Sequence, residues 1–226
     1  MNRPQTDRPP QTAAPQRLLS LDTLRGFDMF FIMGFAALVV SLCRLWPGGF
    51  SDWLIAQMGH AEWDGFFHHD TIFPLFLFIA GISFPFSLAK QRSKGTSERA
   101  ILAKIVRRGL TLVLLGLVYN GLFRLDFATL RLPSVLGRIG LAWMFAALLY
   151  MRFGLRTRIV LAAGILAAYS LVLHFVGAPD APGAGTLTLE GNIAGYIDRR
   201  IMPSHLYLDG FDPEGILSTF PAVVPA

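Results

Sequence analysis

The feature that most constrains the fold is a series of long apolar segments separated by polar loops. Five segments lie at about residues 27–45, 71–89, 109–123, 133–151 and 159–176, and a sixth begins at Ile216. A transmembrane helix needs about 20 mostly apolar residues, and inside lipid only helices or closed barrels satisfy every backbone polar group. The sequence therefore predicts an all-α, polytopic transmembrane helix bundle with five spans and the start of a sixth.

The composition agrees with an integral membrane protein. Hydrophobic residues make up 53% of the 226 residues and charged residues only 15%, whereas soluble domains carry about 25% charged residues. Residues 1–16, rich in Pro, Gln and Thr, predict a disordered cytoplasmic tail. The single cysteine, Cys43, permits no internal disulfide. Asp28 and Arg44 bound the uncharged centre of the first segment, so we expect them near its two membrane interfaces.

Basic residues concentrate in alternate loops. They are frequent before the first segment, after the second and after the fourth, whereas residues 47–70 contain none and residues 177–215 contain two against six carboxylates. Cytoplasmic loops carry the excess of Lys and Arg. The N-terminus is therefore predicted to be cytoplasmic, and the 47–70 and 177–215 loops non-cytoplasmic. Because topology accounts for the net charge of +5, we do not expect nucleic acid binding.

A cluster of titratable residues immediately precedes the second segment. Its members are His60, Glu62, Asp64, His68, His69 and Asp70. Histidine titrates near neutral pH and can take a proton from an amine or hydroxyl, and a nearby carboxylate can orient its ring. The alternative is an interfacial loop whose polar side chains face water. A metal site is disfavoured, since the H-x-x-x-H spacing is absent and adjacent histidines point two ways.

Two arginines also invite a functional interpretation. Arg138 lies inside the fourth segment, where an arginine is costly unless it is paired or faces a cavity. It binds a phosphate or carboxylate ligand, pairs with Asp28, Asp70 or Asp126, or reaches the interface. Arg25, just before the first segment, either anchors that helix at the headgroups or holds an anionic ligand.

Four blocks of sequence, in order, resemble the heparan-alpha-glucosaminide N-acetyltransferase family and its bacterial relatives. They are Arg17–Met29, His60–Gly65 continued by Asp70–Gly81, Leu132–Gly140, and Asp212–Leu217. The resemblance covers the chain from Arg17 onward, so residues 17–226 are expected to form the N-terminal part of a transmembrane acyltransferase domain. Any one block alone would be a weak signal, and the ordered set is a specific one.

The resemblance implies an enzyme that moves an acetyl group from cytoplasmic acetyl-CoA to the amine of a glucosamine-type sugar across the membrane. His60 would be the catalytic base or a transient acetyl carrier, and Asp70 would orient His60 or bind the sugar. Arg25 and Arg138 would bind the CoA phosphates. The expected acceptor contacts are Trp63, Asp64, Asp212 and Glu214. The bacterial relatives imply an inner membrane, with the His60 segment periplasmic and His68 and His69 only interfacial.

The chain departs from the family pattern in two places. Gly137 stands where a larger polar residue is usual. Family members also have more spans, and the chain stops where a sixth would develop, so we expect a C-terminally truncated product. The alternatives are an inactive remnant and a proton-coupled sugar transporter. A transporter would place carboxylates deep within its spans, and segments two, three and five contain none. Homo-oligomerisation stays open, and no metal is expected.

Overall fold

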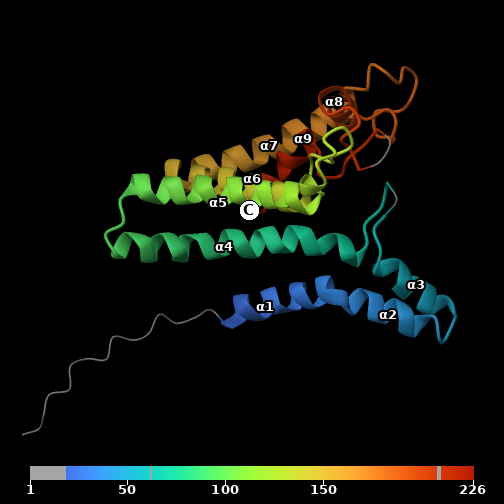
Figure 1. Ribbon diagram of the computed structural model, residues 1–226, viewed down its shortest axis with the longest axis horizontal. Coiled ribbons are helices and arrows are strands. Elements are labelled where there is room, and N and C mark those ends of the chain that lie inside the picture. Colours follow the sequence, from blue (N-terminus) through green and yellow to red (C-terminus); the bar gives the residue numbers. More distant parts are fainter. Residues whose placement is uncertain (1–18, 62, 208–209) are drawn as a thin grey trace, which may run out of the picture.

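The computed structural model describes residues 19–61, 63–207 and 210–226 and is helical almost throughout (Figure 1). The helices are α1 Leu19–Phe30, α2 Ala36–Cys43, α3 Gly49–Gln57, α4 Ile72–Ser93, α5 Glu98–Tyr119, α6 Val135–Arg152, α7 Leu155–Phe175, α8 Ile193–Ile201 and α9 Ile216–Thr219. Within these residues β pairing is limited to a single bridge between Gly177 and Asn192. The predicted all-α class is confirmed. The predicted tail, residues 1–16, and Glu62 lie outside the described residues.

Four helical stretches are long and apolar enough to cross a membrane, which supports an integral membrane protein. They are Leu19–Cys43, His68–Ser93, Val135–Arg152 and Leu155–Phe175. They overlap the predicted first, second, fourth and fifth segments. Most of the third segment lies in α5, but this helix begins at Glu98 and its first half carries Lys104, Arg107 and Arg108. Its apolar part is therefore confined to the second half, where the sequence predicted the span.

The start of the expected sixth span forms only a short helix. Helix α9 has four residues and passes into a 3-10 turn, Pro221–Val223. Proline has no backbone N–H to continue the helical hydrogen bonds and clashes with the preceding turn, so Pro221 ends α9.

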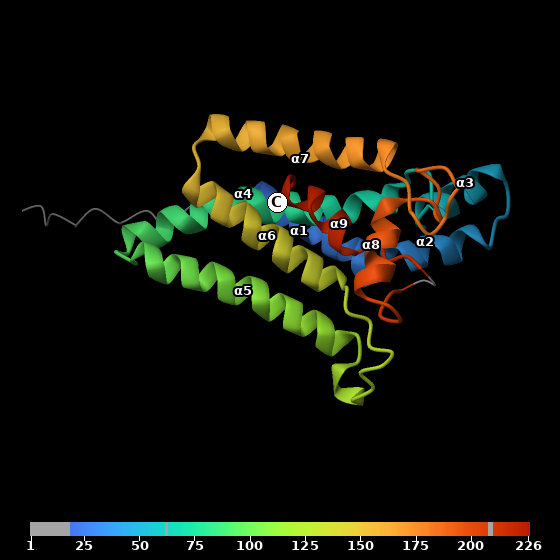
Figure 2. The same cartoon turned by 90° about the horizontal axis from the view of Figure 1, so that it is seen from above.

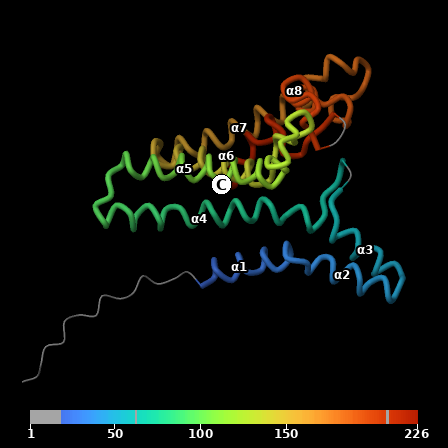
Figure 3. Tube along the Cα trace, viewed as in Figure 1, coloured from blue at the N-terminus to red at the C-terminus, as the bar shows by residue number. Residues whose placement is uncertain are grey.

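The helices form three layers (Figures 1 and 2). The continuous α1–α2 stretch lies along one side of α4, and α5, α6 and α7 lie side by side on the other. The trace in Figure 3 shows α3 between the first layer and α4 at one end of the bundle. At the junction of α4, α5 and α6 the main core cluster contains Phe84, Ile101 and Trp143.

The burial of Asp28 was not predicted. Its surface is 1% exposed, and neither carboxylate oxygen has a hydrogen-bond partner among the described residues. Helix α1 begins at Leu19, eight residues before the predicted start of the first segment, so Asp28 lies inside a helix that packs along α4 (Figure 1). The stretch is kinked just after α1, at a π-helical turn, Phe31–Phe35, in which Gly34 has the non-helical φ of 129°.

Helices α5 and α6 approach closely through glycines. A Cβ on Gly140 would lie 2.7 Å from the carbonyl oxygen of Gly109, and one on Gly116 would lie 2.0 Å from Oγ of Ser134. Ser134 is the N-cap of α6, where its Oγ accepts the backbone N–H of Gly137 at 2.9 Å. Small residues allow such approach between membrane helices. Gly137 belongs to this contact, since a Cβ there would be 2.9 Å from the same Oγ.

Replacing Gly140 by valine is expected to destabilise the fold by about 1–3 kcal/mol, the usual cost of overpacking. Gly164→Val on α7 is the matched control, because nothing lies within 4 Å of the Cβ that it adds. Thermal unfolding of both variants in detergent measures the difference. Equal melting temperatures for the two variants would contradict the tight α5–α6 contact.

Candidate functional site

His60 and Asp70 form a hydrogen-bonded pair at one end of the bundle. Nδ1 of His60 lies 2.6 Å from Oδ1 of Asp70, and Oδ2 of Asp70 accepts the backbone N–H of Phe67 at 2.8 Å. The His60 side chain is 70% exposed and that of Asp70 25%. A carboxylate at Nδ1 favours the tautomer with the proton on Nδ1, which leaves the Nε2 lone pair free. A histidine oriented in this way is suited to accept a proton.

Local structure explains how the two residues meet. Helix α3 ends at Gln57, whose Oε1 accepts the backbone N–H of His68 at 3.1 Å. The chain between them turns through Gly65 at φ 147°, a conformation that favours glycine, and a Cβ there would be 3.1 Å from that of Ala61. A 3-10 turn, His68–Thr71, then leads into α4. Asp70 caps this turn through Phe67, so one carboxylate fixes both the turn and the histidine.

The other two histidines are closer to the site than expected. The His69 ring packs edge-on against that of His60, with ring centroids 4.7 Å apart. His68 contacts Phe31 of the π-helical turn, with centroids 5.1 Å apart. The sequence analysis predicts both to be interfacial residues and expects an adjacent pair to point two ways. The two rings do have different partners, and nothing in the sequence pattern indicated that His69 would contact His60.

Trp63 connects the His60 loop to the long 177–215 loop. Its Nε1–H donates to the carbonyl oxygen of Leu187 at 2.7 Å, and its ring packs edge-on against Phe211 at 5.0 Å. Asp64 is exposed beside it. Trp63 and Asp64 thus lie in the same loop as His60, where an acceptor could reach them.

Asp212 and Glu214 belong to a buried ion-pair cluster instead. Asp212 is fully buried, and its oxygens accept from Nε and Nη2 of Arg131 at 2.8 and 2.7 Å and from the backbone N–H groups of Tyr207 and Glu214 at 2.9 and 3.0 Å. Arg131 also pairs with the Glu214 carboxylate and stacks on the Tyr207 ring at 4.6 Å. Burial raises the pKa of Glu214 above its usual value, and Arg131 partly offsets this.

This cluster was only half visible in the sequence. Arg131 was not singled out, because it stands outside the apolar segments and its partners are 81 and 83 positions away. Asp212 and Glu214 were expected to contact the acceptor. The structure favours a structural role for Asp212, because four donors already occupy its carboxylate.

The 177–215 loop contains a second buried acid. Asp198 of α8 is 1% exposed and accepts the backbone N–H of Ile216 at 2.9 Å. Burial raises its pKa to about 6, against the opposing effect of that hydrogen bond. A Cβ on Gly215 would lie 1.8 Å from Oδ2 of Asp198. The glycine of the fourth sequence block is therefore required by close contact with this carboxylate.

The two arginines predicted to bind CoA are in different places. Arg138 donates to the backbone carbonyl oxygens of Pro213 and Ser218 at 2.8 and 2.9 Å, and its guanidinium lies 4.8 Å from the Phe73 ring centroid. Among the described residues, Arg138 forms no ion pair with Asp28, Asp70 or Asp126. Arg138 thus holds the Pro213–Ser218 segment onto α6.

Arg25 instead borders a cavity of about 490 Å³ between α1, α4 and α5, which we call the α4–α5 cavity. Its polar lining is Arg25, Ser83, Ser87, Gln91, Lys104 and Arg108. Arg25 lies 3.2 Å from Asp22 and 3.3 Å from Ser83 Oγ. Among the described residues that line this cavity, three are cationic and none is a carboxylate, so it suits an anionic ligand with an apolar part.

Among the described residues no group of three or more His, Cys, Asp and Glu side chains is placed to hold a metal ion. The fold and the site together define a helical membrane protein. It carries an oriented histidine at one end of the bundle and a basic cavity that reaches the other end.

Comparison with known proteins finds two relatives of the same name. Heparan-alpha-glucosaminide N-acetyltransferase of Homo sapiens is 28% identical over 263 residues, covering 95% of this chain and 38% of that protein. The Mus musculus protein of the same name is 28% identical over 270 residues, covering 97% of this chain and 39% of its own length. No family model matches the chain. The resemblance to this acetyltransferase family is confirmed, and the chain spans less than half the length of these relatives.

Proposed function

We propose that this protein is a membrane-bound N-acetyltransferase that moves an acetyl group from acetyl-CoA to the amine of a glucosamine-type sugar on the other side of the membrane. The observation that carries the proposal is the His60–Asp70 pair, 2.6 Å apart and open to solvent, in the block that resembles the family's catalytic segment. The relatives' names, which describe acetyl transfer to a glucosaminide, support the same chemistry.

The pair supplies the base that the reaction needs. Nε2 of His60 accepts a proton from the acceptor amine as its nitrogen attacks the thioester carbonyl. The new N–C bond forms, the C–S bond breaks, and the proton leaves with the thiolate. Asp70 stabilises the imidazolium that exists in between. In the alternative order His60 itself attacks and carries the acetyl group before the amine takes it. Both orders require the same free Nε2.

The α4–α5 cavity is the proposed donor site. Phosphates of CoA suit the guanidinium and ammonium groups of Arg25, Lys104 and Arg108. The lining residues of α4 run from Gln91 to Phe76, a length of about 22 Å at 1.5 Å per residue. Asp70 is six residues beyond Phe76, or roughly 9 Å further along the same direction. The cavity thus runs from the basic end of the bundle toward the histidine, as transfer across the membrane requires.

Asp28 favours a second candidate, a proton-coupled sugar transporter. A buried carboxylate without a partner inside a span is typical of proton relays, and it is the feature that the sequence analysis required of a transporter. Sugar uptake by proteoliposomes under a pH gradient, without acetyl-CoA, would support this candidate and oppose the enzyme.

The proposal predicts that Lys104→Gln raises KM for acetyl-CoA by about tenfold, because it removes one charged contact to the donor. Arg107→Gln is the matched control on the same helix, since Arg107 does not line the α4–α5 cavity. Both are assayed with radiolabelled acetyl-CoA and glucosamine. Equal KM values for the two variants would contradict the proposal that the α4–α5 cavity binds the donor. Absence of transfer by the unaltered protein would contradict the enzymatic function itself.

A further inference from the structure

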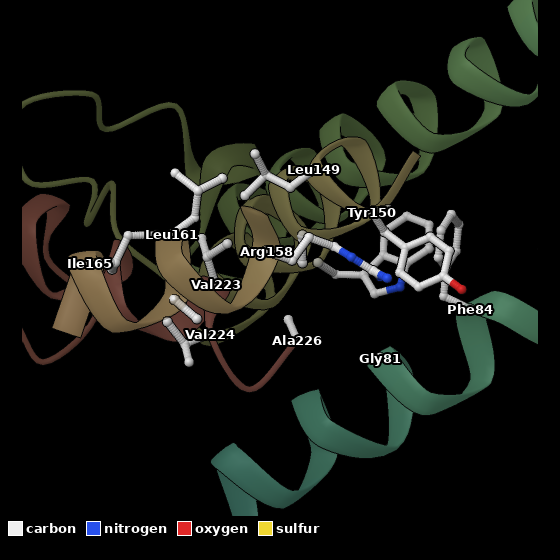
Figure 4. A pocket seen from close by; sticks show the side chains of 14 residues that line it. Gly81, Phe84, Leu149, Tyr150, Arg158, Leu161, Ile165, Val223, Val224 and Ala226 are labelled. Atoms are coloured by element: carbon white, nitrogen blue, oxygen red, sulfur yellow. The ribbon is translucent and has the colours of Figure 1, made fainter. Parts of the chain in front are cut away.

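A separate cavity lies on the far side of Phe84 and Trp143, between α4, α6 and α7 (Figure 4). Its volume is about 190 Å³, and we call it the α4–α7 cavity. Its walls are mostly apolar and include Gly81, Phe84, Trp143, Leu161 and Ile165. Arg158 is the single charged side chain among the described residues that line it. The proposed acetyl transfer does not use this cavity.

Arg158 is the candidate anion-binding side chain of this cavity, whose lining also includes Ala226, the last residue of the sequence. Its guanidinium lies 4.1 Å from the Tyr150 ring centroid, and Figure 4 shows the side chain running along the wall toward Tyr150. Its Nε is buried and lacks a hydrogen-bond partner among the described residues. Arg158 as a whole is half-buried. A buried N–H group without an acceptor is costly, so an anion that accepts from the Arg158 Nε–H would stabilise this arrangement.

The position of Arg158 identifies the source of such an anion. It lies in the first turn of α7, just after the α6–α7 connection, which the charge pattern predicts to be cytoplasmic; Arg152 at the end of α6 and Arg156 in α7 flank this connection. No residue of the apolar stretch of α7 is buried, so this helix borders the lipid. Anionic phospholipids are enriched in the cytoplasmic leaflet, where they attract basic residues.

We propose that the α4–α7 cavity binds one anionic phospholipid. The phosphate accepts from the Arg158 guanidinium in two parallel hydrogen bonds, and the upper part of an acyl chain fills the apolar walls. An arginine that only snorkels keeps its whole head group in water. Arg158 differs, since its Nε is buried and its guanidinium carbon lies over the Tyr150 ring, an arrangement that suits a specific phosphate contact.

The test uses the full chain in detergent micelles and phosphatidylglycerol with brominated acyl chains. Trp143 lines the cavity, so its fluorescence should be quenched by the bound lipid in a variant in which the other three tryptophans are phenylalanine. Arg158→Gln should weaken binding about tenfold, and Arg156→Gln, an exposed neighbour, should leave it unchanged. Arg158→Lys, which keeps the charge without the planar fork, should give an intermediate affinity and guards against misfolding.

Three results would overturn the proposal. One is equal weakening by Arg158→Gln and Arg156→Gln, which would indicate a diffuse surface charge. Another is equal quenching by brominated phosphatidylcholine at the same concentration. The third is displacement of the lipid by millimolar inorganic phosphate, which would indicate a site for the free anion.

Discussion

Replacing His60 by alanine should lower acetyl transfer by about 10²–10⁴-fold, the usual contribution of a general base, and leave the melting temperature unchanged. The second part follows from exposure, because 70% of the His60 side chain faces solvent. His174→Ala is the matched control. His174 is also exposed, near the end of α7, and its Nδ1 bonds to the backbone carbonyl of Ser170 in its own helix. Its loss should leave the rate unchanged.

Asp70→Asn tests whether the carboxylate acts through the histidine. An amide can hydrogen-bond Nδ1, but it does not favour the Nδ1–H tautomer and cannot stabilise the imidazolium. We therefore expect a lower kcat with little change in KM for either substrate, together with an altered pH–rate profile. Added imidazole should partly restore transfer by the His60→Ala variant and not by the Asp70→Asn variant. Full activity of the His60→Ala variant would contradict both proposed roles of His60, as general base and as acetyl carrier.

Much of the fold was predictable because it depends on local composition. Long apolar runs define four of the helical stretches, and the alternation of charge gives their expected order across the membrane. The burial of Asp28 was not predictable in this way. Hydropathy locates the end of a charged stretch, whereas the helix itself begins earlier, and Leu19–Gly26 is helical despite its charges. The same difference extends α5 back to Glu98.

The candidate site divides in the same way. His60 and Asp70 are ten positions apart, so their contact was a reasonable prediction, although their catalytic role stays one. Arg138 could not be resolved from sequence, because its acceptors are the carbonyl oxygens of Pro213 and Ser218, and backbone acceptors leave no residue-type signal. Lys104 and Arg108 join Arg25 only because α5 folds back along α4, which no local pattern reveals.

The cluster around Asp212 leads to the second large effect. Asp212→Ala should destabilise the fold by about 3–5 kcal/mol, because it leaves two buried backbone N–H groups without their acceptor and removes one of the two carboxylates that pair with Arg131. Asp180→Ala is the control. Asp180 also pairs with an arginine in the same loop, Arg199 at 2.8 Å, but its side chain is 43% exposed. Its removal should cost no more than about 1 kcal/mol.

Thermal unfolding in detergent, combined with the KM for glucosamine, distinguishes a structural role of Asp212 from a substrate-binding role. A structural part predicts a large fall in melting temperature for Asp212→Ala, whereas a direct acceptor contact predicts an unchanged melting temperature and a raised KM. We expect the first result, since the carboxylate is fully buried and four donors already occupy its oxygens. The Asp212–Gly215 block would then serve the reaction indirectly, by fixing the loop whose Leu187 carbonyl and Phe211 ring hold Trp63 beside His60.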